Sequence, residues 1–210
     1  MPYSLNEIEA MCKRATRGAG LPWGIAEEAG KASRWLASHN LPGPEMLSKL
    51  LALHQGTVYQ DFTPVFEGTE FRPTSDTLCP LMAGAALIDR ISEFPDGQHI
   101  EFKSIAYPIL LAPYAAFCAR KIGLQFELSW AGVRVIISPE GHLKIEGNTA
   151  LITSPHSTSV VGRSSSTNTD FLPQKISSRD VDTEGWNSLA GFSSRMYAPA
   201  TEASRKLGAG

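Results

Sequence analysis

Residues 124–148 consist of short runs in which apolar and polar side chains alternate, separated by turn residues. The apolar side chains of the first run are Leu124, Phe126, Leu128 and Trp130. After Ala131-Gly132 come the runs 133–137 and 142–146, and Gly147-Asn148 then turns into 149–153. Alternation with a period of two is typical of strands with one buried face, and turns this short join antiparallel neighbours. The pattern therefore predicts an antiparallel meander with a core on one side of its sheet.

The N-terminal part of the chain has helical spacing instead. Ser4 and Glu7 have the spacing of a capping box, in which the Ser4 hydroxyl accepts from the Glu7 amide and the Glu7 carboxylate reaches back. Apolar residues recur after them at helical intervals, and Gly18 is a natural stop. A first helix is therefore predicted from about Leu5 to Gly18.

Two more helices are predicted before residue 57. One lies between the glycine-rich segment 18–24 and Pro42, and the other covers about 44–56, with a proline suited to its first position. On the second helix, we expect Glu27 and Lys31 to face each other at a spacing of four residues.

The middle of the chain is divided by prolines and glycines into shorter segments. Residues 81–91 are apolar and rich in small side chains, a pattern that fits a buried strand and a buried helix equally. Residues 100–106 are predicted as a strand. Residues 113–121 fit a short buried helix closed by Gly123, although their aromatic residues would also suit a strand.

Residues 153–169 are rich in serine and threonine. This composition fits a mobile surface loop, or edge strands in which Val160 and Val161 are the only buried pair. A structureless segment of this length is unusual in a compact domain, so it either has a function or contains a strand. Asp182 is expected to begin a last helix, followed by a glycine-rich tail.

Together these patterns predict an α+β fold in which an N-terminal helical layer packs against a mainly antiparallel sheet. We expect one domain over residues 1–210, because 42% of its 210 residues are hydrophobic and can form one core. Its parts are a helical portion (1–56), a mainly β portion with short helices (57–180), and a C-terminal helix with a Gly-rich tail (181–210).

Charge and hydropathy exclude several classes of partner. The chain has 19 basic and 21 acidic residues, a net charge of −2, so we expect it to bind no nucleic acid. A helix-turn-helix is disfavoured because Glu27 and Glu28 open the second helix, where they would repel phosphates. The longest apolar run, 105–119, contains two prolines and is too short to span a membrane, and the N-terminus lacks the apolar run of a signal peptide. We therefore expect a soluble, cytoplasmic protein without a membrane partner; a homo-oligomer is compatible with the sequence.

The cysteines and histidines show no metal-ligand spacing. Cys12, Cys79 and Cys118 are far apart and odd in number, which supports neither a disulfide framework nor a zinc module. We expect no metal site and an inert, buried Cys118. The glycines of 18–24 follow a helix rather than a strand and lack the spacing of a dinucleotide loop, so the cofactor is unknown and a plain turn between helices is favoured.

Four residues are candidates for a ligand-binding site. The first two are Trp23 and Glu28. Glu28 lies on the flank of an apolar stripe, beside Trp23 and Trp35, and would face a ligand if partly buried. The alternative is a solvated face on which Glu27, Glu28, Lys31 and Arg34 form ion pairs at spacings of three and four residues. Asp89 ends an apolar run, either as a strand-end carboxylate at a pocket rim or as a residue on a helix surface.

The fourth candidate is Arg205, in the segment 197–210. Tyr197, Pro199, a capping Thr201 and Leu207 would order this segment. We expect it to pack near the N-terminal helices and to offer the Arg205 guanidinium to a carboxylate or phosphate. The alternative is an exposed turn in which Arg205 pairs with Glu202.

Three stretches together resemble a known family. They are Leu5–Glu9 with Gly20–Glu28, Cys79–Gly84 with Asp89, and Tyr197–Arg205 leading to Gly208–Gly210. In this order they are similar to an uncharacterised bacterial family described only as a domain of unknown function. The resemblance would cover nearly the whole chain, and it implies no reaction.

The function that this sequence favours is binding of a small polar or anionic metabolite. The alternative is a non-catalytic subunit or scaffold of a metabolic complex. A third interpretation is an enzyme that uses the carboxylate of Glu28 or Asp89 as an acid or base.

Overall fold

The computed structural model describes residues 2–58, 61, 63–93, 99–163, 171 and 176–196. The helices are α1 (Leu5–Gly18), α2 (Trp23–Ser38), α3 (Gly43–Leu53), α4 (Pro80–Arg90), α5 (Ala112–Ile122) and α6 (Thr183–Ser194). The strands are β1 (Pro2–Ser4), β2 (Val65–Glu67), β3 (Glu70–Arg72), β4 (His99–Ala106), β5 (Phe126–Trp130), β6 (Val133–Ile137), β7 (Leu143–Gly147), β8 (His156–Arg163) and β9 (Ser178–Asp180). This confirms an α+β fold.

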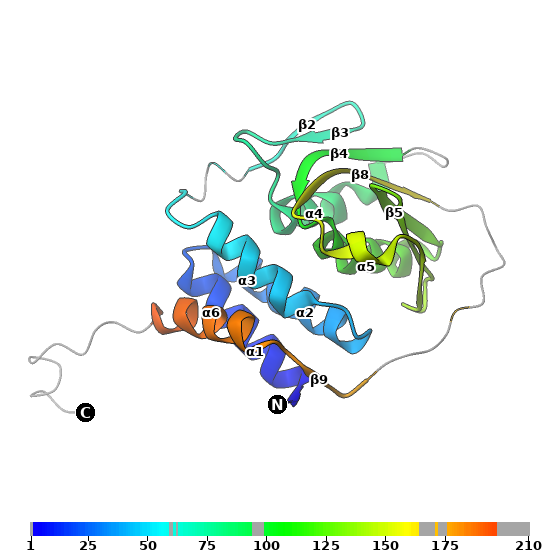
Figure 1. Cartoon of the computed structure of the whole chain (residues 1–210). Helices are drawn as coiled ribbons and strands as arrows, with labels where there is room; N and C mark the ends of the chain where they lie inside the picture. The colour runs from blue at the N-terminus through cyan, green and yellow to red at the C-terminus, as the bar shows by residue number, and fades with distance from the viewer. Residues whose placement is uncertain are drawn as a thin grey trace, which may run out of the picture.

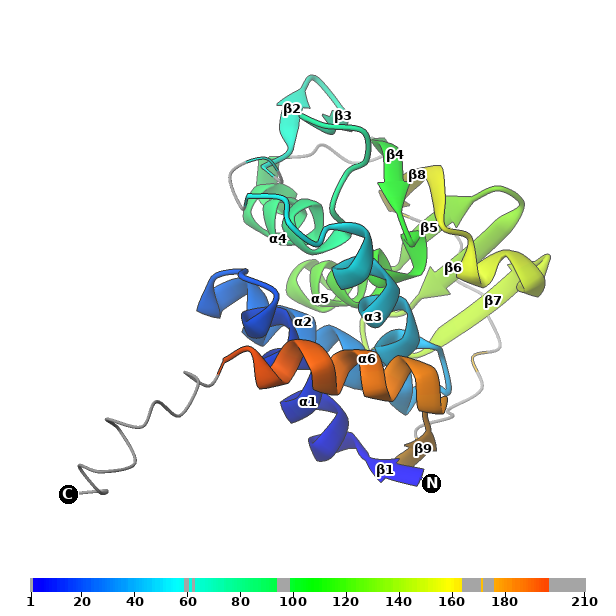
Figure 2. The same cartoon turned by 60° about the vertical axis from the view of Figure 1, so that its left-hand side comes forward.

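The first helix begins and ends where the sequence predicts. The Ser4 side chain accepts a hydrogen bond from the Glu7 amide, and the Glu7 carboxylate accepts one from the Ser4 amide at 2.8 Å. β1, just before this helix, pairs with β9 as a small two-stranded sheet. The C-terminal helix α6 then packs on α1 and α3, and its Asp182 caps it by accepting from the Gly185 amide. The first and last elements of the described chain therefore pack side by side (Figure 2).

The larger sheet of the described residues has seven strands in the order β2-β3-β4-β8-β5-β6-β7. All neighbours are antiparallel except β3 and β4, which run parallel. The run β5-β6-β7 is the predicted meander. The continuation through 149–153 is not a fourth strand but a 3-10 helix, opened by Asn148, whose side chain accepts from the Ala150 amide.

Helices α4 and α5 lie between the sheet and the N-terminal helices (Figure 1). α5 packs on β5 and β6, α4 packs on β4, and both also contact α2. The ambiguous segment 81–91 is thus a helix, with Pro80 in its first turn. One cluster of buried apolar side chains extends from Ile8 of α1 to Phe192 of α6. The predicted helical layer is present, and its contact with the sheet passes through these two middle helices.

Strand β8 corrects the interpretation of 153–169 as a loop or an edge. It lies in the middle of the sheet, between β4 and β5. Its buried side chains are Ser159 and Val161, one strand period apart, whereas Val160 points to the opposite face and is only partly buried. Ser159 is aligned with Phe102 of β4 and with Trp130 of β5. A small residue here leaves room for the two aromatic side chains beside it.

Cross-helix ion pairs correct the expected pairing of Glu27 with Lys31. Glu27 accepts from Lys13 of α1 at 2.7 Å, and Arg34 contacts Glu9 of α1 at 2.8 Å.

Among the described residues, no helix is both long and apolar enough to cross a membrane.

Candidate functional site

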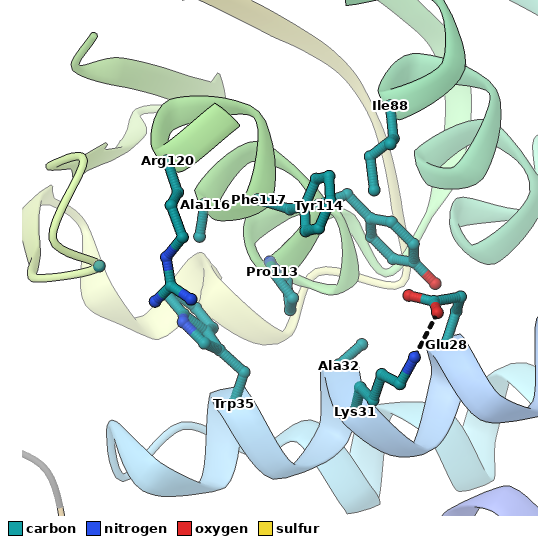
Figure 3. A pocket seen from close by; sticks show the side chains of 11 residues that line it. Glu28, Lys31, Ala32, Trp35, Ile88, Pro113, Tyr114, Ala116, Phe117 and Arg120 are labelled. Carbon is teal, nitrogen blue, oxygen red and sulfur yellow. Dashed lines mark hydrogen bonds and ion pairs between the residues drawn. The ribbon is translucent and has the colours of Figure 1, made fainter. Parts of the chain in front are cut away.

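A groove with a volume of about 280 Å³ lies between α2 and α5 (Figure 3). Its lining is Glu28, Lys31, Ala32 and Trp35 from α2, Pro113, Tyr114, Ala116, Phe117 and Arg120 from α5, Ile88 from α4, and Gly141 from the turn between β6 and β7. Typical small-molecule sites have volumes of roughly 300–1,000 Å³, so the volume of the groove is just below that range.

The sequence of α5 explains why one of its sides forms the wall of a groove. Ala112, Ala115, Cys118 and Ala119 are buried on the side toward the sheet. Gly123 ends the helix in the left-handed conformation, with φ 70°, so that the chain can turn directly into β5. Phe117 and Arg120, three residues apart, therefore share the side that faces away from the sheet, and Phe117 is 51% exposed.

One end of the groove is formed by Tyr114. Its side chain is 2% exposed, and its hydroxyl is buried without a hydrogen-bond partner in the described part of the chain. The ring packs directly on Gly84 of α4, where the Cβ of any other residue would overlap with it. Burial raises the pKa of the Tyr114 hydroxyl above its ordinary value, so it remains a neutral phenol that can donate.

The hydroxyl of Tyr114 points toward the Glu28 carboxylate (Figure 3). Glu28 in turn accepts from the Lys31 ammonium at 2.8 Å. Their side chains are 40% and 59% exposed, so both can change rotamer at little cost. This end of the groove therefore combines a buried donor with a neutralised, movable ion pair.

Arg120 forms the opposite end. Its side chain extends toward the Trp35 indole (Figure 3), and Nη2 lies 3.7 Å from the position that a Cβ on Gly141 would occupy. Within the described residues, Arg120 has no carboxylate partner. The ring nitrogens of His39 lie 2.8 Å from the carbonyl oxygen of Trp35 and 3.0 Å from that of Gly141, and so attach the β6–β7 turn to α2. The groove thus has an unneutralised guanidinium on a fixed rim.

Of the sequence-predicted site residues, the groove contains Glu28. Trp23 is 52% exposed at the start of α2 and does not line the groove. Lys13 and Arg17 of α1 lie 5.8 and 5.3 Å from the centroid of its ring, so its aromatic face is covered by cations of its own chain.

The other two candidates lie elsewhere. Asp89 is exposed on the last turn of α4, so it lies on a helix surface and not at the end of a strand. It does not line the groove. Arg205 and the segment 197–210 lie outside the described residues. Among the described residues, the structure therefore brings Glu28 together with neither Trp23 nor Asp89, and the role of Arg205 stays a prediction.

The cysteines are buried, as expected for Cys118. Burial raises the pKa of the Cys118 thiol to about 12 and that of Cys79 to about 11. Such thiols are poor nucleophiles. In the described part of the chain, no three His, Cys, Asp or Glu side chains are arranged to hold a metal ion.

Tyr114, Phe117 and Arg120 are not among the site residues that the sequence predicts. All three lie in a segment whose pattern fits a short buried helix and would also suit a strand. The one available signal was an apolar ring and a guanidinium three residues apart on the side of that helix opposite its alanines. That signal is weak, because the second wall of the groove comes from a helix about 80 residues earlier.

Part of the chain matches a family whose description states no function. The model of a family described as "Protein of unknown function (DUF3726)" matches residues 3–74. This agrees with the resemblance over the first of its three stretches, and the other two stretches lie outside the matched residues. The matched region includes the α2 wall of the groove and stops before α5.

No curated protein matches the chain. Among solved structures, the chain is similar to malate dehydrogenase from Entamoeba histolytica, with 10% sequence identity and a TM-score of 0.44. The similarity covers 75% of this chain and 48% of that one, so the chain spans about half the length of this structure.

Proposed function

We propose that the groove between α2 and α5 binds a small anionic metabolite. The observation that carries this proposal is Arg120, a guanidinium on the rim of the groove that has no carboxylate partner among the described residues. A guanidinium presents several donors in a planar fork that matches the two oxygens of a carboxylate or phosphate.

The remaining lining residues support binding of a small molecule. Pro113, Phe117 and Ile88 provide apolar surface between the two polar ends, and a few polar groups on an apolar wall are typical of ligand pockets. Glu28 does not oppose an anion at the Arg120 end, because it is paired with Lys31 at the other end of the groove.

A thermal-shift screen of small carboxylates and phosphate esters tests the proposal. A ligand present at a hundredfold excess over its Kd stabilises the fold by about 2.7 kcal/mol, which is easily measured as a rise in Tm. We expect Arg120→Ala to abolish the shift of any compound that binds.

The matched control is Lys121→Ala, which removes the same charge from the next residue of α5, outside the groove lining. It should keep the ligand shift. The proposal is wrong if no anion binds, or if both variants retain the same affinity.

We further propose that this binding takes place in the cytoplasm. Cys12, Cys79 and Cys118 are all free thiols, a state typical of proteins in a reducing compartment. Quantitative thiol labelling of the unfolded protein, taken directly from cells under acid quench, should show three reduced cysteines. Oxidised cysteines in that experiment would contradict the proposal.

A further inference from the structure

We infer that the ligand of the groove is an elongated hydroxy-carboxylate whose carboxylate contacts Arg120 and whose hydroxyl lies between Tyr114 and Glu28. This inference rests on the proposed function and adds to it the class of ligand. It comes from the two ends of the groove, which differ in chemistry.

The Tyr114 end has an unused donor. The phenol is 2% exposed, and its hydroxyl has no hydrogen-bond partner among the described residues. Buried hydroxyls are rarely left unpaired, because the desolvated donor is unfavourable without an acceptor. A ligand oxygen at this end would accept that hydrogen bond once the exposed Glu28 side chain shifts enough to admit it between the phenol and the carboxylate.

The group that fits this end is neutral. A ligand carboxylate would face the Glu28 carboxylate, and a ligand ammonium would compete with Lys31, which already donates to Glu28 at 2.8 Å. A ligand hydroxyl is neither repelled by Glu28 nor in competition with Lys31. Its oxygen accepts from Tyr114, and its own hydrogen is donated to a Glu28 oxygen, so both protein groups gain a partner.

The Arg120 end requires an anion, and its distance from the Tyr114 end sets the length of the ligand. Tyr114 and Arg120 are six residues apart on α5, about 9 Å along the helix axis at 1.5 Å per residue. On the opposite wall, Glu28 and Trp35 are seven residues apart on α2, about 10 Å along its axis. The two polar groups of the ligand are therefore separated by an apolar body, which Phe117 and Pro113 contact in the middle of the groove (Figure 3).

Three probes separate the contributions of the two ends. Para-hydroxyphenylpropionate has both polar groups on a rigid body, phenylpropionate lacks the hydroxyl, and para-ethylphenol lacks the carboxylate. Calorimetric titration of the full chain should show para-hydroxyphenylpropionate binding about tenfold more tightly than phenylpropionate, the effect of one hydrogen bond to a buried donor. Para-ethylphenol should bind more weakly than either.

Three variants assign these preferences to residues. Tyr114→Phe should bind both carboxylates with the affinity that the wild type has for phenylpropionate, so the tenfold preference disappears. Arg120→Ala should lose both carboxylates and retain any binding of para-ethylphenol. Because Tyr114→Phe removes a hydroxyl that has no partner among the described residues, its urea unfolding midpoint should equal or exceed that of the wild type. Glu28→Gln is the second variant at this end; it should reduce the preference while keeping the size of the side chain.

The outcomes distinguish the two proposals. Equal affinity of the wild type for the two carboxylates overturns the inference, and the proposed function stands as long as Arg120→Ala abolishes binding. A tenfold preference that persists in Tyr114→Phe also overturns it. If none of the three probes binds, the inference is wrong, and the anion screen alone decides the proposed function.

Discussion

The two sides of α2 meet their neighbouring helices in opposite ways. On the α1 side, Gly30 allows close approach, because a Cβ there would lie 2.9 Å from the backbone oxygen of Glu9. Ion pairs cross this contact from Lys13 to Glu27 and from Arg34 to Glu9. On the α5 side, Trp35 and the residues opposite it enclose a groove.

The difference shows how one helix makes a close contact on one side and borders an open groove on the other. Where a glycine brings two backbones together, no space remains for a ligand, and the charged side chains at the edge pair with each other. Where large side chains keep the helices apart, space remains, and polar groups such as the Tyr114 hydroxyl have no partner in the described structure. We therefore expect added atoms to destabilise the α1 side and to be tolerated on the α5 side.

The largest effect is expected for Gly18→Ala at the end of α1. A Cβ at this position would overlap with the backbone oxygen of Phe192 in α6, which cannot move without displacing that helix. We expect the free energy of unfolding to fall by about 3 kcal/mol, measured by urea denaturation. An unchanged midpoint would contradict the close packing of α1 on α6.

Gly30→Ala tests the contact between α1 and α2 directly. The new methyl would press on the oxygen of Glu9 and, at 3.1 Å, on the Cβ of Lys13. We expect a loss of about 1–2 kcal/mol in the same assay.

The control for both glycine variants is Gly191→Ala in α6, where, among the described residues, no atom outside the adjacent helix backbone lies within 4 Å of the added Cβ. There the substitution should raise stability by about 0.5–1 kcal/mol, because alanine favours a helix over glycine. If Gly30→Ala also raises the free energy of unfolding, α1 and α2 do not pack as closely as the 2.9 Å distance at Gly30 indicates.

Ala32→Met adds atoms on the groove side of the same helix. The flexible side chain can extend into a cavity of about 280 Å³, so we expect the free energy of unfolding to change by less than about 1 kcal/mol. Filling the space should abolish the ligand shift of the wild type. A large loss of stability would show that this side is as closely packed as the other.

The smallest effect is a pH dependence at the α1–α2 contact. The hydrogen bond and the charge of Lys13 lower the pKa of Glu27 below its ordinary value of 4.5. A lowered folded-state pKa contributes stability above 4.5, which is lost as the pH falls through the folded value. The wild type should therefore be slightly more stable than Glu27→Gln at neutral pH, and urea midpoints should converge well below 4.5. Convergence in high salt at neutral pH is also expected, because the pair is exposed.

Local signals were sufficient for much of the fold. The capping box at Ser4, the stop at Gly18 and the left-handed Gly123 are short-range devices, and each is in the structure where the sequence places it. The meander was equally readable, because its turns contain residues with positive φ such as Gly132 and Gly141.

Sequence patterns did not predict contacts between residues that are distant in the chain. Ser159 belongs to a central strand because of what lies beside it, Phe102 and Trp130, and nothing within the Ser/Thr-rich segment indicates this. The groove also depends on a contact between segments that are distant in the chain. Glu28 was noted on the flank of its helix, but Arg120 and Tyr114 become part of a site only when α5 lies opposite α2.

The central position of β8 has a consequence for synthesis on the ribosome. The strands on its two sides, β2-β3-β4 and β5-β6-β7, are all translated before it. Until residues 156–163 leave the exit tunnel, the nascent chain holds two half-sheets with the edges of β4 and β5 unpaired. Completing the sheet is thus a late event that closes a gap rather than extends an edge. Ribosome-bound chains that end before residue 156 should be the species most dependent on chaperones.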